Sequence, residues 1–105
     1  MAVEMATATQ YDVRIGHPKA GQYTVLTIQE DLDRFSALCR ELGIASDGTT
    51  AMEAAINVQL AVKEALEVAR EHGISAGKPV DDSAIFDFLQ NHRGPEPMTG
   101  FILTI

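Results

Sequence analysis

The chain has 105 residues, of which 46% are hydrophobic and 22% are charged, and this composition is typical of one globular domain. Its formal charge of -7 at pH 7 repels phosphate backbones and anionic lipid surfaces, so we expect neither nucleic acid nor a membrane as a partner. A single cysteine, Cys39, excludes a disulfide within the chain. The first residues carry neither the basic region nor the apolar run of a signal peptide, and we expect a cytoplasmic protein.

The N-terminal part of the chain predicts an arm followed by a β-hairpin. Residues 1–10 show no sustained hydrophobic period, and we expect a flexible arm there and a single domain over residues 11–105. Residues 11–15, YDVRI, alternate apolar and polar side chains as a half-buried strand does, and residues 22–28, QYTVLTI, are rich in β-branched and aromatic side chains. The turn residues between these two runs favour an antiparallel N-terminal hairpin.

Residues 28–42 show a helical pattern. Thr27 and Glu30 have the spacing of a capping box. The apolar side chains that follow recur at helical spacing, and they are Leu32, Phe35, Leu38, Cys39 and Leu42. Because Gly43 comes next, in the position where a left-handed residue closes a helix, the pattern predicts a first helix over 28–42.

A second and longer helix is predicted over residues 51–72. Thr50 and Glu53 repeat the capping box, and Gly73 follows the last helical residue. Such a helix is about 33 Å long at 1.5 Å per residue. Apolar side chains occupy a wider sector of this helix than one core face needs, so the sequence indicates a surplus of apolar surface.

The glycines and the lysine of residues 71–82, EHGISAGKPVDD, do not form a phosphate-binding loop. Such a loop needs the pattern G-x-x-x-x-G-K-[ST] after a strand and before a helix. Here Gly73 and Gly77 are one residue too close, Pro79 stands in place of the hydroxyl residue, and a helix precedes them. We therefore interpret Gly73 as a helix stop.

The last third of the chain predicts a short helix and a strand. Asp81 or Asp82 can cap a third helix over about 82–92, which ends before Gly94 and Pro95. Residues 101–105, FILTI, have a high β preference and almost no polar alternation, so this C-terminal strand is either central in its own sheet or in contact with a second subunit. The predicted fold class is α+β, with the helices on one face of a small antiparallel or mixed sheet.

No catalytic or metal-binding motif occurs in the sequence. The three histidines, His17, His72 and His92, are scattered and form no H-x-x-x-H pattern, and there is no C-x-x-C pattern. Cys39 has no nearby histidine that could take its proton, and a G-x-S-x-G nucleophile motif is absent. We therefore expect no catalytic residues, no metal site and no cofactor.

Two hypotheses for the function follow. In the first, the chain is a non-catalytic interaction or assembly module that self-associates as a homodimer, or binds another protein, through apolar helix and strand surface. The interface residues that this hypothesis predicts are Val58, Leu60, Val62, Phe101 and Leu103. A long helix buried entirely within its own domain explains the same pattern equally well.

In the second hypothesis, the chain is a small-molecule-binding protein or a small enzyme. A pocket between the helices and the sheet would then carry polar groups at its mouth, and the candidates are Tyr23, His92 and Arg93.

Overall fold

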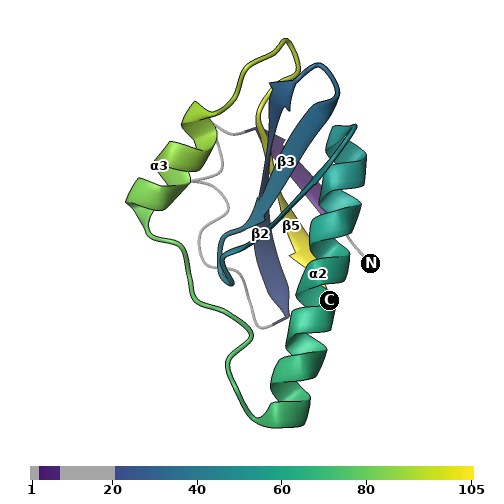
Figure 1. Ribbon diagram of the computed structural model, residues 1–105, viewed down its shortest axis with the longest axis vertical. Coiled ribbons are helices and arrows are strands. Elements are labelled where there is room, and N and C mark those ends of the chain that lie inside the picture. The colour runs from purple at the N-terminus through teal and green to yellow at the C-terminus, as the bar shows by residue number, and fades with distance from the viewer. Residues whose placement is uncertain (1–2, 8–20) are drawn as a thin grey trace.

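The computed structural model describes residues 3–7 and 21–105 and shows a five-stranded antiparallel sheet with two helices (Figure 1). Four of the strands lie within residues 21–105, and β1 is the fifth. The elements in chain order are β1 (Val3–Thr7), β2 (Gln22–Asp31), β3 (Arg34–Cys39), β4 (Ile44–Gly48), α2 (Ala51–His72), α3 (Asp82–Gln90) and β5 (Thr99–Thr104). The strand order is β1-β5-β2-β3-β4. This confirms the predicted α+β class.

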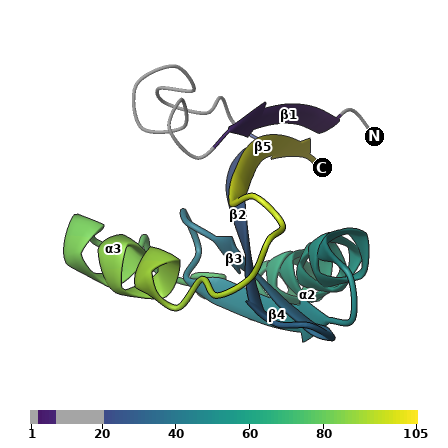
Figure 2. The same cartoon turned by 90° about the horizontal axis from the view of Figure 1, so that it is seen from above.

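The two helices lie on opposite faces of the sheet, and Figure 2 shows α2 and α3 on either side of it. Val25 belongs to the core cluster beneath α2, whereas its neighbour Leu26 packs with Ile85 of α3. Successive side chains of a strand point to opposite faces. The prediction that all helices cover one face is therefore wrong, and the central strand β2 is covered on both sides.

The helix predicted over residues 28–42 is also wrong. These residues form the second half of β2, a tight turn, the strand β3 and the start of the next turn. Residues 24–29 are all buried because both faces of β2 are covered. A strand of this kind shows no alternation of apolar and polar side chains, so the spacing of its apolar side chains can match that of a helix.

Thr27 and Glu30, the two residues of the expected capping box, form hydrogen bonds within the sheet instead. The hydroxyl groups of Thr27 and Thr99 form a hydrogen bond with each other across β2 and β5. The Ser36 hydroxyl donates to the Glu30 carboxylate, which ties β3 to β2. Both polar side chains of the pattern therefore hold the sheet together.

Gly43 has the left-handed conformation that the sequence indicates, but in a hairpin turn. Its φ of 65° is close to the 64° of Gly73, and each N–H donates to the carbonyl four residues earlier, that of Cys39 and of Ala69 respectively. Residues 40–46, RELGIAS, and residues 70–76, REHGISA, are similar in sequence, and both contain this turn. This turn joins two strands in the first segment and ends α2 in the second.

The long helix α2 has the predicted bounds, whereas α3 ends at Gln90 instead of about residue 92 and β5 covers residues 99–104 instead of 101–105. The N–H of Glu53 donates to the Thr50 hydroxyl at 3.0 Å, and the N–H of Ala84 donates to the Asp81 carboxylate at 2.8 Å, so both caps form as predicted. Strand β5 pairs with β1 on one side and with β2 on the other, which makes it an inner strand. Neither of the two described helices is long and apolar enough to span a membrane.

The N-terminal predictions are tested only in part. Residues 11–15, the first strand of the predicted hairpin, lie outside the described residues. Both neighbours of β2 in the sheet, β3 and β5, come later in the chain, so the predicted pairing of residues 22–28 with residues 11–15 is not found among the described strands. Residues 3–7, within the predicted arm, form β1 beside β5, and the division into an arm and a domain at residue 10 stays a prediction.

The segment after α2 returns to the sheet and is held against the turn between β3 and β4. The N–H of Val80 donates to the Arg40 carbonyl at 2.9 Å. Gly77 lies so close to this turn that an added Cβ would stand 2.1 Å from the Leu42 carbonyl oxygen. Residues 74–76 are thereby fixed beside the last turns of α2.

Candidate functional site

The three residues predicted at a pocket mouth do not come together. Tyr23 lies near the beginning of β2, whereas His92 and Arg93 contact Gln29 towards its end. Six steps along a strand correspond to about 20 Å at 3.3 Å per residue. One small ligand would not reach both places, so the structure gives two separate polar sites to consider.

The first polar site is a clamp around Gln29, a residue that is 3% exposed. Its N–H donates to His92 Nδ1 at 3.1 Å, and its carbonyl accepts from the N–H of Arg93 at 2.6 Å. Its side-chain Oε1 accepts from the N–H of Glu96 at 2.9 Å. These three bonds fasten the loop after α3 to the end of β2, and His92 takes part in them as an acceptor through Nδ1.

The second polar site surrounds Tyr23 and Cys39 at the other end of β2. Glu41 folds back, and its carboxylate accepts the N–H of Thr24 at 2.6 Å. Burial raises the pKa of the Cys39 thiol to about 11, and the nearby Glu41 charge adds to this increase. Burial also raises the pKa of Tyr23, with further contributions from Cys39 and Glu41. The thiol therefore stays protonated at neutral pH and is a poor nucleophile.

A metal site is not formed by the part of the chain that the structure describes. Within it, no three histidine, cysteine, aspartate or glutamate residues are grouped so that they could hold a metal ion.

The predicted interface residues divide into two groups. Val58, Val62, Phe101 and Leu103 are buried in the core between α2 and the sheet. They have almost no surface left for a partner. Leu60, by contrast, is exposed on the other side of α2.

Leu60 belongs to a row of exposed apolar side chains that we call the α2 ridge, which consists of Met52, Ile56 and Leu60. Their exposed fractions are 73%, 49% and 58%. Residues four apart on a helix are neighbours on one face, so these three side chains form a continuous apolar strip. Met52 and Ile56 were not predicted as surface residues, although their spacing of four is visible in the sequence.

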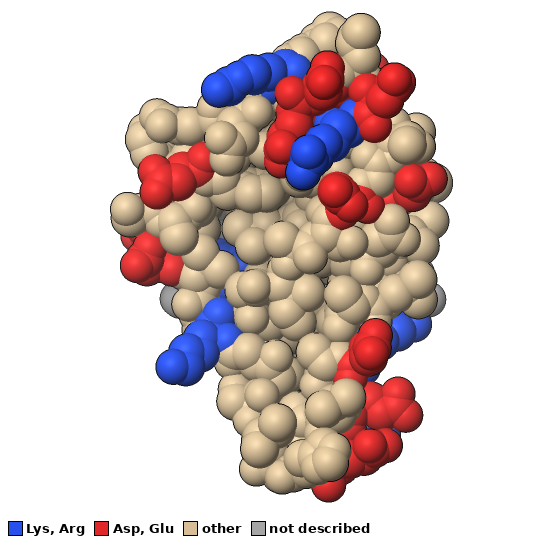
Figure 3. All heavy atoms as spheres, in the orientation of Figure 1, with Lys and Arg blue, Asp and Glu red and all other residues tan. Residues whose placement is uncertain are grey.

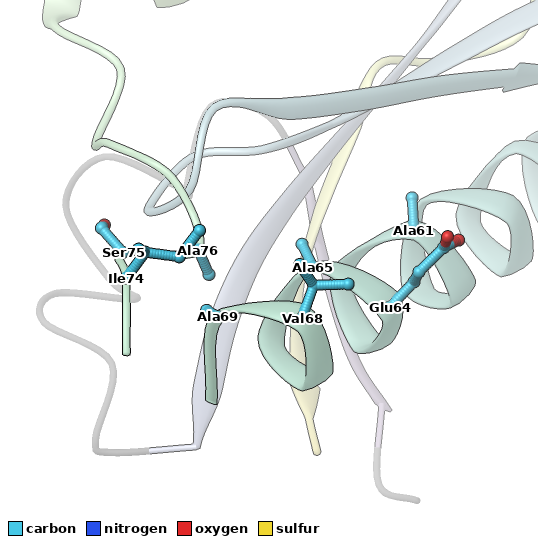
Figure 4. A pocket seen from close by; sticks show the side chains of 8 residues that line it. All are labelled: Ala61, Glu64, Ala65, Val68, Ala69, Ile74, Ser75 and Ala76. Atoms are coloured by element: carbon cyan, nitrogen blue, oxygen red, sulfur yellow. The ribbon is translucent and has the colours of Figure 1, made fainter. Parts of the chain in front are cut away.

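A groove lies beside the C-terminal half of α2, and we call it the α2 groove (Figure 4). It has a volume of about 370 Å³. Small or apolar side chains form most of its wall, and Glu64 and Ser75 are its polar members. The lining residues are Ala61, Glu64, Ala65, Val68, Ala69, Ile74, Ser75 and Ala76.

Charged side chains leave part of the surface free. On the face drawn in Figure 3, acidic and basic side chains lie mainly towards the edges, and the central area between the two helices is almost without charge. This face therefore carries a neutral area although the chain has a formal charge of -7.

Comparison with protein-family models, with curated proteins and with solved structures finds no match for this chain. The α2 ridge and the α2 groove are therefore the features of this chain that can indicate a function.

Proposed function

We propose that the protein is a non-catalytic interaction module that self-associates as a homodimer through α2. The observation that carries this proposal is the α2 ridge, three large apolar side chains in one row that their own chain leaves in water. Burial of apolar surface is favourable in proportion to the area removed from water, and contiguous apolar strips mark contact sites. A single free and buried cysteine is compatible with a reducing compartment, and a cytoplasmic location is part of the same proposal.

The size of the ridge sets the expected affinity. A large aliphatic side chain with half or more of its surface exposed offers on the order of 100 Å². The ridge alone therefore contributes about 300 Å² per copy, compared with about 800 Å² per partner in a standard interface. A dimer held by the ridge alone would be weak and would depend on protein concentration.

The experiment is a measurement of solution mass by sedimentation equilibrium, from about 1 μM to about 1 mM protein. We expect the wild type to shift from monomer to dimer over this range, and Leu60→Glu to remain monomeric. Phe86→Glu is the matched control, because Phe86 is an apolar residue of α3 that is 61% exposed and lies outside the ridge. A monomeric wild type, or equal losses in both variants, would contradict the proposal.

A second candidate function is small-molecule binding in the α2 groove. Its volume of about 370 Å³ is within the range of ligand pockets, and Glu64 and Ser75 offer polar contacts. Tyr23, His92 and Arg93, the residues predicted at the mouth of a pocket, do not line this groove, so the α2 groove is a different site. A monomer whose melting temperature rises with a metabolite would favour this function, because a ligand that binds the native state stabilises it.

A further inference from the structure

We infer that the free edge of β4 and the α2 groove together bind an extended, basic peptide segment of another protein, which adds an antiparallel strand to the sheet at Ala45. The α2 ridge takes no part in this site. The flank of α2 that contacts β4 forms it instead, so the site goes beyond the proposed function and does not require a dimer.

Strand β4 is an edge of the sheet with free backbone groups. It pairs with β3, and no other described strand lies beside it. The Asp47 carbonyl accepts from the side-chain amide of Asn57 in α2 at 2.8 Å, so the backbone groups of Asp47 point away from β3. Along an antiparallel strand the residues alternate in the side to which their N–H and C=O point. Ala45 therefore also points these groups outwards, and neither finds a partner in the part of the chain that the structure describes.

The residues of β4 do little to prevent the addition of a strand. Natural edge strands are often protected by lysine or proline. Strand β4 has neither, its Ala45 is exposed, and its single charged residue, Asp47, lies 3.8 Å from Arg34. Figure 2 shows β4 at the end of the sheet opposite to β1, and this end faces the viewer in Figure 3, where the central area is almost without charge. The edge is therefore a template for a further strand.

One end of this edge is closed and the other is open. At the Gly48 end, Asn57 occupies the Asp47 carbonyl, and the Glu53 carboxylate accepts from the N–H of Thr49 at 2.9 Å. An added strand therefore finds free groups from Ala45 onwards, in the direction away from Gly48.

The α2 groove begins level with Ala45. Helix α2 runs back along β4, because its first turn lies against Gly48 and the segment after it lies against the turn between β3 and β4. Two strand steps from Asp47 to Ala45 cover about 6.6 Å, and four helix steps from Asn57 to Ala61 cover about 6 Å. Ala61, the first residue that lines the groove, therefore stands beside the free groups of Ala45.

The groove and the contact with β4 lie on one flank of α2. Because each helical residue turns by about 100°, Asn57, Ala61 and Ala65 follow one another at steps of about 40° around the axis. The two alanines leave space beside the helix, and Figure 4 shows residues 74–76 on its other side. The close approach of Gly77 to the turn between β3 and β4 fixes this wall. The groove therefore exists before a ligand arrives, which lowers the entropic cost of binding.

The chemistry of the site selects an extended basic peptide. Free backbone groups at a sheet edge are matched by the backbone of a β-strand, and pockets for alternate side chains add specificity. The groove of about 370 Å³ has mainly small or apolar walls and accepts aliphatic side chains. Its Glu64 is exposed and forms no ion pair within the described residues, so a lysine or arginine can pair with it. A second copy carries the same carboxylate and a formal charge of -7, and it is a poorer match than a basic peptide.

Antiparallel pairing determines which peptide side chains reach the groove. Ile44 and Ser46 lie opposite Cys39 and Ala37, which belong to the core beneath α2, so Ala45 points to the other face of the sheet. A peptide residue opposite Ala45 is bonded to it through its backbone and also points away from α2. The residues before and after it point towards α2 and the groove.

The probe is a fluorescently labelled synthetic peptide, Lys-Thr-Val-Thr-Val-Thr-Lys, whose lysines and valines share one face. Fluorescence anisotropy during titration with the protein should show saturable binding, with a dissociation constant below about 1 mM. N-methylation of the threonines removes the N–H groups that face β4 and should weaken binding at least about tenfold. N-methylation of the valines is the matched control, because their N–H groups point away from β4, and it should change binding less than about threefold.

Variants of the protein test the edge and the groove separately. Ala45→Pro removes the outward N–H and leaves the bonds to β3, because proline is tolerated on an edge strand, and Ala45→Ser is its control. Ala65→Leu fills the groove, and Ala84→Leu, at an exposed alanine of α3, is the control for added bulk. We expect Ala45→Pro and Ala65→Leu to weaken binding at least about fivefold, the controls to bind like the wild type, and Glu64→Gln to weaken binding about threefold. Far-UV circular dichroism checks folding, and the methylated peptides test the edge on the unchanged protein.

Each result supports or overturns a defined step. Weaker binding in Ala45→Pro and with methylated threonines, but not in the controls, supports strand addition at β4. No binding of the probe at about 1 mM protein, or equal binding of both methylated peptides, overturns it. A homodimer that Ala45→Pro dissociates would assign the edge to a second copy and overturn the peptide as its occupant. A wild type that binds the probe as a monomer supports this site and refutes the dimer through the α2 ridge, so the two proposals fail separately.

Discussion

Val58 and Leu60 allow a direct test of how α2 is oriented on the sheet. They are two residues apart in the sequence, but Val58 is fully buried in the core and Leu60 is 58% exposed. Val58→Ala removes two methyl-sized groups at about 0.8 kcal/mol each and leaves a cavity, which adds a cost of similar size. We expect a loss of about 2–3 kcal/mol in the free energy of unfolding for Val58→Ala.

Leu60→Ala should change the free energy of unfolding by less than about 0.5 kcal/mol, because the site is exposed and alanine is at least as good a helix former as leucine. In thermal unfolding followed by circular dichroism, about 4–8 °C per kcal/mol predicts a decrease of about 10–20 °C for Val58→Ala. Leu60→Ala should shift the midpoint by no more than about 4 °C.

The measurement is made at low protein concentration, where dimer formation does not add stability. Equal midpoint decreases for the two variants would mean that Leu60 is packed within its own chain. The ridge, and with it the proposed dimer, would then be refuted.

Three further predictions concern buried polar groups. The Thr24 hydroxyl is buried and has no hydrogen-bond partner in the described part of the structure, so Thr24→Val should raise the urea midpoint by an amount equivalent to about 1 kcal/mol; a lower midpoint would contradict this. His92→Ala leaves the Gln29 N–H unpaired and should cost about 1–3 kcal/mol in the same assay, whereas an unchanged midpoint would show that the clamp contributes nothing. Cys39 should resist alkylation in the native state at neutral pH. Because the pKa of Cys39 is raised from 9.0 to about 11, its protonated thiol contributes to the free energy of unfolding, and this contribution is complete below about pH 9. It is lost as the pH rises through 11, which lowers the free energy of unfolding by up to about 2–3 kcal/mol. A pH profile of Cys39→Ala as steep as that of the wild type would argue against this assignment.

Local signals in the sequence were sufficient for α2 and α3. Thr50, Asp81 and Gly73 each act within one helical turn, so neighbouring residues determine the caps, and the structure forms them as predicted. The signals failed for residues 28–42 because their environment is set by distant segments. Phe35, Ala37 and Cys39 face α2, and Leu26 of the preceding strand faces α3, so apolar side chains are needed on both faces.

The candidate site was predictable only in outline. The sequence shows that α2 carries more apolar side chains than one core face uses, and the exposed Met52 and Leu60 account for part of this surplus. Which side of α2 faces the sheet depends on tertiary packing, so Val58 could not be separated from Leu60. The role of His92 was hidden for the same reason, because its partner Gln29 is 63 residues away in the sequence.

The acidity of the chain gives the proposed dimer a salt dependence of defined sign. Two copies that each carry a formal charge of -7 repel each other, and added salt screens this repulsion. Self-association through an apolar surface should therefore become tighter between low and physiological ionic strength. A basic partner that binds the acidic residues Glu64, Glu67 and Glu71 of α2 would show the opposite sign, because salt screens attraction as well. Sedimentation at two salt concentrations separates these cases, and self-association that weakens with salt would count against an apolar α2 interface.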